Sequence, residues 1–402
     1  MPGEVSIRSS AISELFSRAS DACFFSGVGD LGETLSRTNM AYGIAKIRWV
    51  QEQLGMVPDA SFVSAPDATI TRNIDRWRSG FGYGGRLRHR GDFVVLDIKS
   101  NACGLFLGRF TELPEPEAML ARIRDLSAGE SFVQQTATSW DFGLSNHFVH
   151  VMRFEKPIEG SPYGVLCHGS GPELRSPGPW GPGLYVNRSP RLAELSRTEE
   201  TPWGPLRIIA GREAVAEYWQ GYLAAERHSH ERRRKMAEAL FPDLVEVSNL
   251  THQGALAPND YLIGGVAEVG DAVVPLALRA ELPVYLLSAR PSFSNAAQEL
   301  LGFGERAARM GLSDVVSNAN VLPHGGGYSL PGYKAVDRVL EFDHGKRIYV
   351  MEVAQGTSAR AYHDNFRHVP FDYRGEEVLR RVEELDMGEV TNRGLPLYEF
   401  MV

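Results

Sequence analysis

The sequence predicts an α+β fold, because short apolar runs rich in β-branched and aromatic residues are interspersed with longer helical patterns. Its composition supports a folded protein: 43% of the 402 residues are hydrophobic and 23% are charged, as in globular chains with a sizeable core. The sequence contains no internal repeat, low-complexity tract or clear linker. Length alone would allow two or three domains, although a large mixed α/β enzyme can also form one continuous core.

The expected elements of the first third begin with helical patterns near residues 10–19 and 30–54. A loop rich in glycine and arginine follows at 79–91. Residues 93–98 are typical of a buried strand, because this run is short, apolar and preceded by glycines. A further helix is expected at 115–127, where two glutamates and a proline resemble a first helical turn.

The rest of the chain continues the same mixture. Residues 147–154 alternate between apolar and polar side chains as a strand does, and 163–167 form another short apolar strand. A proline-rich stretch at 171–205 predicts a loop. The longest helical pattern covers 211–240. We also expect strands at 244–249, 261–263, 272–278 and 283–288, and a helix at about 294–310.

Charge and cysteine content exclude some classes of protein. The net charge of -8 argues against a generally basic surface that coats nucleic acid, but it leaves a local basic groove open. Three cysteines, Cys23, Cys103 and Cys167, are too few for a disulfide framework, so free thiols or metal ligation are expected. The N-terminus lacks the pattern of a signal peptide, and no run approaches the roughly eighteen apolar residues of a membrane span. The expectation is a soluble, cytoplasmic protein with no membrane partner.

Two basic segments are candidates for a local nucleic-acid groove. Between residues 72 and 90, arginines alternate with Trp77, Phe81 and Tyr83 among glycines, which suits phosphate contact and base stacking. A solvated charged surface is the other interpretation, and the sequence leaves both open. The second segment, residues 232–235, lies in a helical pattern, where a solvated helix face is the favoured interpretation. The arginines of the first segment are Arg72, Arg76, Arg78, Arg86, Arg88 and Arg90.

Four residues share one local design, in which an apolar strand-like run ends and a cysteine or histidine follows beside glycine, asparagine or serine. They are Cys103, His147, His168 and His252. Strand ends hold side chains on a rigid scaffold at the mouth of a pocket. Thiolate and imidazole favour borderline-soft divalent metals, and a nearby carboxylate adds affinity for harder ions such as manganese. Taken singly, each residue is more typical of a structural histidine or a small core cysteine. The repetition favours a metal-dependent active site.

A fifth peptide, the HGGGY segment that begins at His324, carries a different chemistry. Three glycines allow the backbone to approach phosphate oxygens closely and to offer several N–H donors. A neutral imidazole at this place can act as a nucleophile toward phosphorus and form a covalent phosphoramidate. The alternative is a tight glycine turn without a ligand.

Taken in order, these peptides resemble the RtcB family of RNA-splicing ligases over roughly residues 90–335. The matching pieces are a DI…CG segment, NHF, HGSG, a later single histidine after a strand, and HGGGY. In this sequence they begin at Asp97 (with Cys103 six residues later), Asn146, His168, His252 and His324. The order and spacing of the set are more specific than any one motif.

The resemblance implies one large α+β domain of RtcB-like type over residues 1–402, using GTP and two manganese ions. Such enzymes guanylylate a histidine and transfer GMP to the 3'-phosphate of an RNA that ends in a 3'-phosphate or a 2',3'-cyclic phosphate. They then join the activated end to a 5'-hydroxyl, in RNA repair or tRNA splicing. The resemblance implies that His324 is the nucleophile and that Asn146, Gly325, Gly326 and Gly327 contact the nucleotide. The implied metal ligands are Asp97, Cys103 as a bridge, His147, His168 and His252.

The chain departs from the family at several positions. Ser100 stands where the family has an aspartate, so Asp97 and Asn101 are the candidates to complete a second metal site. His150 replaces an acidic residue, Tyr328 replaces an arginine, and the C-terminal lysine is absent. Because most of these differences concern the nucleotide, two alternatives stay open. One is a metal-dependent phosphohydrolase or phosphoryl-transfer enzyme that uses an activated water, and the other is a non-catalytic binder of RNA ends.

Overall fold

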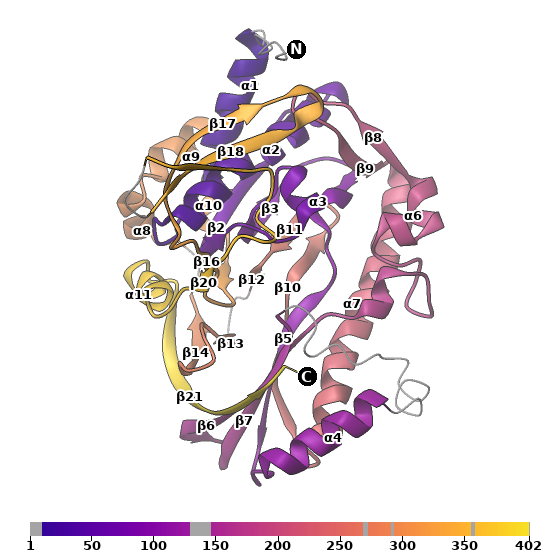
Figure 1. Cartoon of the computed structure of the whole chain (residues 1–402). Helices are drawn as coiled ribbons and strands as arrows, with labels where there is room; N and C mark the ends of the chain where they lie inside the picture. The colour runs from indigo at the N-terminus through magenta and orange to yellow at the C-terminus, as the bar shows by residue number, and fades with distance from the viewer. Residues whose placement is uncertain (1–9, 129–145, 268–271, 291–292, 355–357, 402) are drawn as a thin grey trace.

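A curled sheet of eleven strands runs through the molecule and joins strands from both ends of the chain (Figure 1). The computed structural model describes residues 10–128, 146–267, 272–290, 293–354 and 358–401. The strands of this sheet are β1 (Cys23–Phe24), β2 (Ser61–Thr69), β3 (Tyr83–Arg88), β5 (Cys103–Phe110), β6 (Phe148–Ile158), β7 (Ser161–Gly169), β10 (Val245–Ala257), β11 (Asp260–Ile263), β13 (Val273–Leu276), β14 (Val284–Ala289) and β21 (Gly388–Phe400). Their order is β1-β2-β3-β11-β10-β5-β7-β6-β21-β14-β13. Only the β1–β2 pair is parallel among these neighbours.

Two long helices pack on this sheet. Helix α2 (Leu31–Gln53) begins after Asp30, whose side chain accepts the Glu33 N–H as an N-cap, and it packs beside β2. Helix α7 (Arg212–Leu240) packs across the central strands β5, β7 and β10. The shorter helices are α1 (Ser10–Asp21), α3 (Ile74–Arg78), α4 (Pro116–Ala128), α6 (Pro190–Leu195), α8 (Asn295–Leu300), α9 (Gly304–Met310), α10 (Ser313–Ser317) and α11 (Glu377–Glu384), with 3₁₀ turns η1 (Leu96–Ile98), η2 (Pro172–Arg175), η3 (Val186–Arg188) and η4 (Asp343–Gly345).

Smaller sheets border the main one. One contains β4 (Phe93–Val95), β9 (Leu206–Ala210) and β8 (Ser196–Glu199), and another contains β17 (Tyr333–Glu341), β18 (Arg347–Val353) and β19 (Arg360–His363). Two pairs complete the described strands: β12 (Gly265–Ala267) with β15 (Val321–Pro323), and β16 (Tyr328–Ser329) with β20 (Asp372–Tyr373). Strand β15 leads directly into the HGGGY segment.

The central strand β5 is buried on both faces. Phe106 belongs to an apolar cluster with Met236 of α7, while Leu105 and Leu107 belong to another with Leu286 of β14. Alternate residues of a strand point to opposite faces, so this division follows from the strand geometry. A strand packed on both sides is a rigid support for the residue at its start.

The predicted α+β class is confirmed, and four expected elements need correction. The expected loop at 171–205 contains the helix α6 and the strand β8. Of residues 93–98, only Phe93–Val95 form a strand, in a smaller sheet, and the run then turns as η1. The expected loop at 79–91 contains β3, because β2 and β11 offer hydrogen-bond partners on both sides. The helix expected at 294–310 is divided into α8 and α9, with Gly302 at φ 63° between them. No helix in the described ranges combines the length and apolar character needed to cross a bilayer.

Candidate metal centre

Four of the candidate metal ligands lie on neighbouring strands at the centre of the sheet. Cys103 is the first residue of β5, whose neighbours are β7 and β10. His168 is the second-last residue of β7, and His147 immediately precedes β6. Because β6, β7, β5 and β10 are adjacent in the sheet, residues far apart in the sequence meet at one place.

His252 reaches this place through a β-bulge in β10. Thr251 pairs with Gly104 and Gln253 pairs with Cys103, so His252 is the extra residue between them. A bulge re-aims the side chain that it carries. The sequence indicated a strand that ends before His252, whereas β10 continues to Ala257 because β5 and β11 pair with it on either side.

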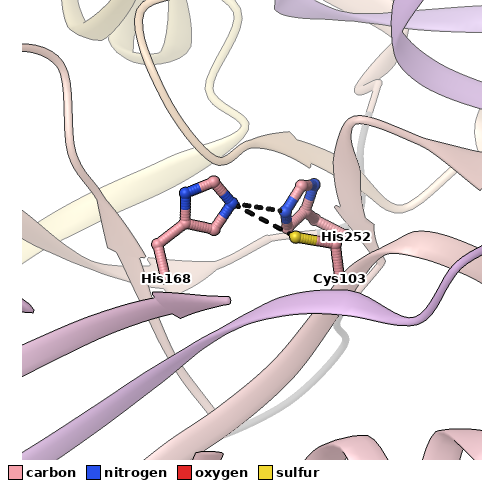
Figure 2. Close-up of side chains that lie close together, drawn as sticks. All are labelled: Cys103, His168 and His252. Atoms are coloured by element: carbon pink, nitrogen blue, oxygen red, sulfur yellow. Dashed lines mark hydrogen bonds between the residues drawn. The ribbon is translucent and has the colours of Figure 1, made fainter. Parts of the chain in front are cut away.

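The donor atoms of these side chains are close together. Cys103 Sγ is 3.4 Å from His168 Nε2 and 3.6 Å from His147 Nε2, and His168 Nε2 is 3.0 Å from His252 Nε2. Figure 2 shows His168 directed at both Cys103 and His252. A tetrahedral zinc ion with bonds of about 2.0 Å to nitrogen and 2.3 Å to sulfur separates its donors by roughly 3.3 to 3.5 Å. The cluster therefore has the dimensions of a metal-ligand set.

Hydrogen bonds at the other ring nitrogens orient two of the histidines. His168 Nδ1 is 2.8 Å from the carbonyl oxygen of Asn146, which can only accept, so Nδ1 carries the proton. With a proton on Nδ1, the nitrogen left to bind a metal is Nε2, the atom that faces the cluster. His252 Nδ1 is 3.3 Å from the Tyr83 hydroxyl, and its Nε2 also faces the cluster. Metal-binding histidines are commonly held in this way.

The electrostatics favour the forms of thiol and imidazole that bind metals. Burial acts to raise the pKa of the Cys103 thiol, but the positive charge that the neighbouring histidines carry when protonated, His168 foremost, outweighs it and holds the pKa well below its usual value. Burial, followed by the proximity of His324, lowers the pKa of His252 to about 3, so this ring is neutral near pH 7. A thiolate and neutral imidazoles are the species that a metal requires.

The turn before β5 is held in an unusual backbone conformation. Lys99 and Ala102 have φ angles of 57° and 55°, in the left-handed region that residues other than glycine rarely occupy. Gln253 and Arg76 each donate to the carbonyl oxygens of Ile98 and Lys99. Such strain persists only where surrounding contacts over-determine the conformation. The start of β5 is therefore positioned by the protein itself.

Helix α7 buries two arginines beneath the cluster. Arg233 donates to the Ala102 carbonyl at 3.0 Å, and Arg232 donates to the Ser170 carbonyl at 2.9 Å. Both arginines are fully buried, so the interpretation of residues 232–235 as a solvated helix face is wrong for these two. The following Arg234 and the lysine after it do remain exposed. Four consecutive basic residues predict a solvent-exposed segment. Nothing in the local sequence distinguishes the buried Arg232 and Arg233 from the two exposed residues that follow.

Asp97 does not join the cluster, and its expected role as a ligand is corrected. Its carboxylate accepts the backbone N–H of Arg207 at 2.9 Å and lines a separate cavity together with Lys46. The cause is the η1 turn, which replaces the second half of the expected strand. Asn101, the other candidate, accepts the backbone N–H of Cys103. Within the described ranges, the candidate metal-binding group of three or more side chains contains no carboxylate.

His324 lies against the cluster and contacts a buried aspartate that the sequence analysis did not identify. The rings of His324 and His252 stack with centroids 4.1 Å apart and an interplanar angle of 11°. Asp67 Oδ2 is 3.1 Å from His324 Nδ1 and accepts the His324 backbone N–H at 3.3 Å. Asp67 is 1% exposed and is the one charged residue of β2. A single charged residue in a segment that is otherwise uncharged was the sequence signal that could have revealed Asp67.

Two of the three glycines after His324 are required by packing. A Cβ atom on Gly326 would lie 2.4 Å from the carbonyl oxygen of Arg374, and one on Gly327 would lie 2.4 Å from that of Asp67. Gly327 also has a φ of 65°. The nearest atom to a Cβ on Gly325 would be 3.1 Å away. Tight packing is thus sufficient to explain glycine at two of these positions.

A cavity of about 580 Å³ lies beside His324. Asn146, Phe148 and the three glycines line it, so the residues predicted for nucleotide contact surround one space. His150 and Glu399 line the same cavity, with His150 Nδ1 3.1 Å from a Glu399 carboxylate oxygen. Its volume falls within the range of about 300 to 1,000 Å³ typical of small-molecule sites.

The arginine-rich segment at 72–90 is occupied by contacts within the protein. Arg86 and Arg88 both pair with Asp260, and the other four arginines also donate to protein carbonyl or carboxylate groups. Trp77 and Phe81 are 1% and 0% exposed. The combination of free arginines and exposed rings expected of a base-stacking groove is therefore not present in this segment.

Comparisons with known proteins assign the chain to no family: no family model matches it, and no curated protein matches it. What can be said of the site thus depends on its own geometry. That geometry combines one thiolate, three imidazoles, a histidine paired with a buried carboxylate and an adjoining cavity.

Proposed function

We propose that this protein is an RtcB-like RNA ligase that joins an RNA 3'-phosphate or 2',3'-cyclic phosphate end to a 5'-hydroxyl end through a guanylylated His324. The observation that carries the proposal is the position of His324. Its ring stacks on His252, its Nδ1 contacts Asp67, and it lines the 580 Å³ cavity. A nucleophile, a ligand cluster and a nucleotide-sized space therefore adjoin one another. The order of the sequence motifs supports the same function.

The donor set supports a divalent metal at Cys103, His168 and His252, and His147 Nε2, 3.6 Å from Cys103 Sγ, is a further candidate ligand. A thiolate with imidazoles and no carboxylate suits zinc better than manganese. Manganese is proposed here because of the family resemblance alone, and Cys103, His168 and His252 would hold it. When bound, the metal would neutralise charge on phosphate oxygens and orient them for attack.

In the proposed first step, His324 Nε2 attacks the α-phosphorus of GTP. The P–N bond forms as the P–O bond to the departing pyrophosphate breaks. Asp67 keeps the proton on Nδ1, so the lone pair is on Nε2, and its carboxylate offsets the positive charge that develops on the ring. Water hydrolyses a 2',3'-cyclic phosphate end to a 3'-phosphate and a free 2'-hydroxyl. An oxygen of the RNA 3'-phosphate then displaces His324 from the guanylyl phosphorus. Attack by the 5'-hydroxyl on the activated 3'-phosphate releases GMP and joins the strands.

Intact-mass analysis tests this proposal directly. The full chain is incubated with manganese and, in separate samples, with each of the four nucleoside triphosphates. We expect a GMP adduct on the wild type and on His368→Ala, a control at an exposed histidine, and none on His324→Ala. Absence of an adduct with all four triphosphates would contradict the proposal.

Activity measurements on two variants separate the alternatives. Phosphate-ester hydrolysis that persists in His324→Ala but is lost in Cys103→Ala would indicate a metal-dependent phosphohydrolase or phosphoryl-transfer enzyme. Salt-sensitive RNA binding without turnover would indicate a binder of RNA ends. We favour the ligase because the order of the sequence motifs matches that family; a carboxylate at Nδ1 prepares a histidine for general-base activation of water as well as for nucleophilic attack.

A further inference from the structure

A second cavity, of about 640 Å³, shares no lining residue with the cavity beside His324. Its walls come from α2, η1, β9, the turn before β18 and residues 184–187. Basic side chains line it from separate segments, among them Lys46, Lys99, Arg207 and Lys346. Its volume is also within the range of about 300 to 1,000 Å³ found for small-molecule sites.

Lys46 is the buried cation of this cavity. It is 1% exposed, and its Nζ donates to the Pro205 carbonyl at 3.1 Å, its one hydrogen bond within the described residues. Burial, followed by the charge of Arg347, lowers the pKa of Lys46 to about 7, against the opposing effect of Asp97 and Glu200. An ammonium group has three donors. A protonated Lys46 therefore has hydrogen-bonding capacity that an anionic ligand in the cavity could satisfy.

Two further cations of the cavity form no ion pair among the described residues. Arg207 and Lys346 are exposed, and neither forms an ion pair with a carboxylate in the part of the chain that the structure describes. The Lys99 and Arg78 side chains, by contrast, are each paired with an aspartate. Asp97 lines the same cavity and attracts Lys46 and Arg207. Six lysine and arginine side chains nevertheless line the cavity against three carboxylates, so its charge is positive.

We propose that this cavity binds the phosphate group of a small phosphorylated organic ligand, with Lys46, Arg207 and Lys346 contacting the phosphate oxygens. Three cations match a dianionic phosphate better than a singly charged carboxylate. Leu184 and Tyr185 line the same cavity and offer an apolar wall for the organic part of the ligand. Because Lys46 is buried, a terminal phosphate suits this position better than a continuous nucleic-acid backbone. The proposal is independent of the ligase function.

Isothermal titration calorimetry of the full chain with ribose 5-phosphate tests this site. The wild type should bind ribose 5-phosphate saturably and more tightly than inorganic phosphate, and it should not bind ribose. Lys46→Met and Arg207→Gln should each weaken binding about tenfold or more, as expected for the loss of one charge-assisted contact. Arg212→Gln, a control at an exposed arginine outside the cavity, should leave the affinity unchanged.

The variants also define what would overturn the proposal. If the wild type and Arg207→Gln bind ribose 5-phosphate with equal affinity, the proposal is overturned. The Arg207 side chain is exposed, so this variant should fold and keeps the test valid even if Lys46→Met does not fold. Absence of saturable binding by the wild type at millimolar ribose 5-phosphate would also overturn it. Displacement of the probe by an RNA oligonucleotide without terminal phosphates would contradict a site for small ligands.

Discussion

Replacement of Asp67 by asparagine should slow formation of the His324 adduct about 10³-fold. The Asp67 carboxylate is 3.1 Å from His324 Nδ1, and both residues are buried. A negative charge about 4 Å from a developing positive charge contributes roughly 4 kcal/mol at an effective dielectric constant of 20, or about three decades in rate. Asparagine preserves the size of the side chain but removes this charge. An amide N–H directed at Nδ1 would also move the ring proton to Nε2 and remove the nucleophilic lone pair.

The assay is a single-turnover time course of the adduct by intact mass, at saturating GTP and manganese. Metal content should be unchanged in Asp67→Asn, because Asp67 contacts His324 and lies outside the cluster of Cys103, His168 and His252. Asp125→Asn, a control at an exposed aspartate, should react at the wild-type rate. Adduct formation by Asp67→Asn at the wild-type rate would refute a role for Asp67 in preparing the nucleophile.

Three further perturbations test the cluster, its support and the second cavity. Cys103→Ser should weaken divalent-metal binding by about 100-fold or more in competition with a chromogenic chelator, and wild-type affinity would argue against ligation. Arg233→Met should lower the free energy of unfolding in guanidinium by about 3 kcal/mol, because several buried acceptors lose their donor. The control Arg234→Met, at an exposed arginine, should lower it by less than about 1 kcal/mol. Equal losses of stability in the two variants would contradict this account. The pKa of Lys46 is about 7 in the folded state, against an ordinary value of 10.5, so the folded state binds fewer protons between these values. Stability should therefore rise from pH 7 to 9, by up to about 1.4 kcal/mol per pH unit, relative to Lys46→Met. Parallel pH profiles of the two proteins would show that Lys46 does not titrate in this way.

The sequence was sufficient to identify the cluster residues but not how they meet. Cys103 and His168 each follow a recognisable local pattern, and the structure brings their donor atoms to 3.4 Å. The contact arises because β5 lies between β7 and β10, and strand order is a property of the whole sheet that no local pattern contains. The same limit explains the error at Asp97, since its strand-like run belongs to a smaller sheet and turns away as η1.

Buried charges were the other feature that the sequence did not reveal. Arg232 and Arg233 follow the pattern of a surface helix, yet the protein interior supplies acceptors for both. Arg232 pairs with Glu173, Arg233 donates to Asn249, and both donate to backbone carbonyls near Cys103 and His168. Asp67 is buried because His324, which lies far from it in the sequence, supplies its partner. Whether a charge can be buried depends on such tertiary partners, so local patterns alone do not predict it.

Anomalous diffraction from crystals grown with manganese would test the central claim most directly. Data collected on both sides of the manganese edge should show an anomalous peak within bonding distance of Cys103 Sγ, His168 Nε2 and His252 Nε2, next to the ring of His324. Strong anomalous peaks elsewhere, with these three side chains unchanged and no peak between them, would contradict a metal centre at this position.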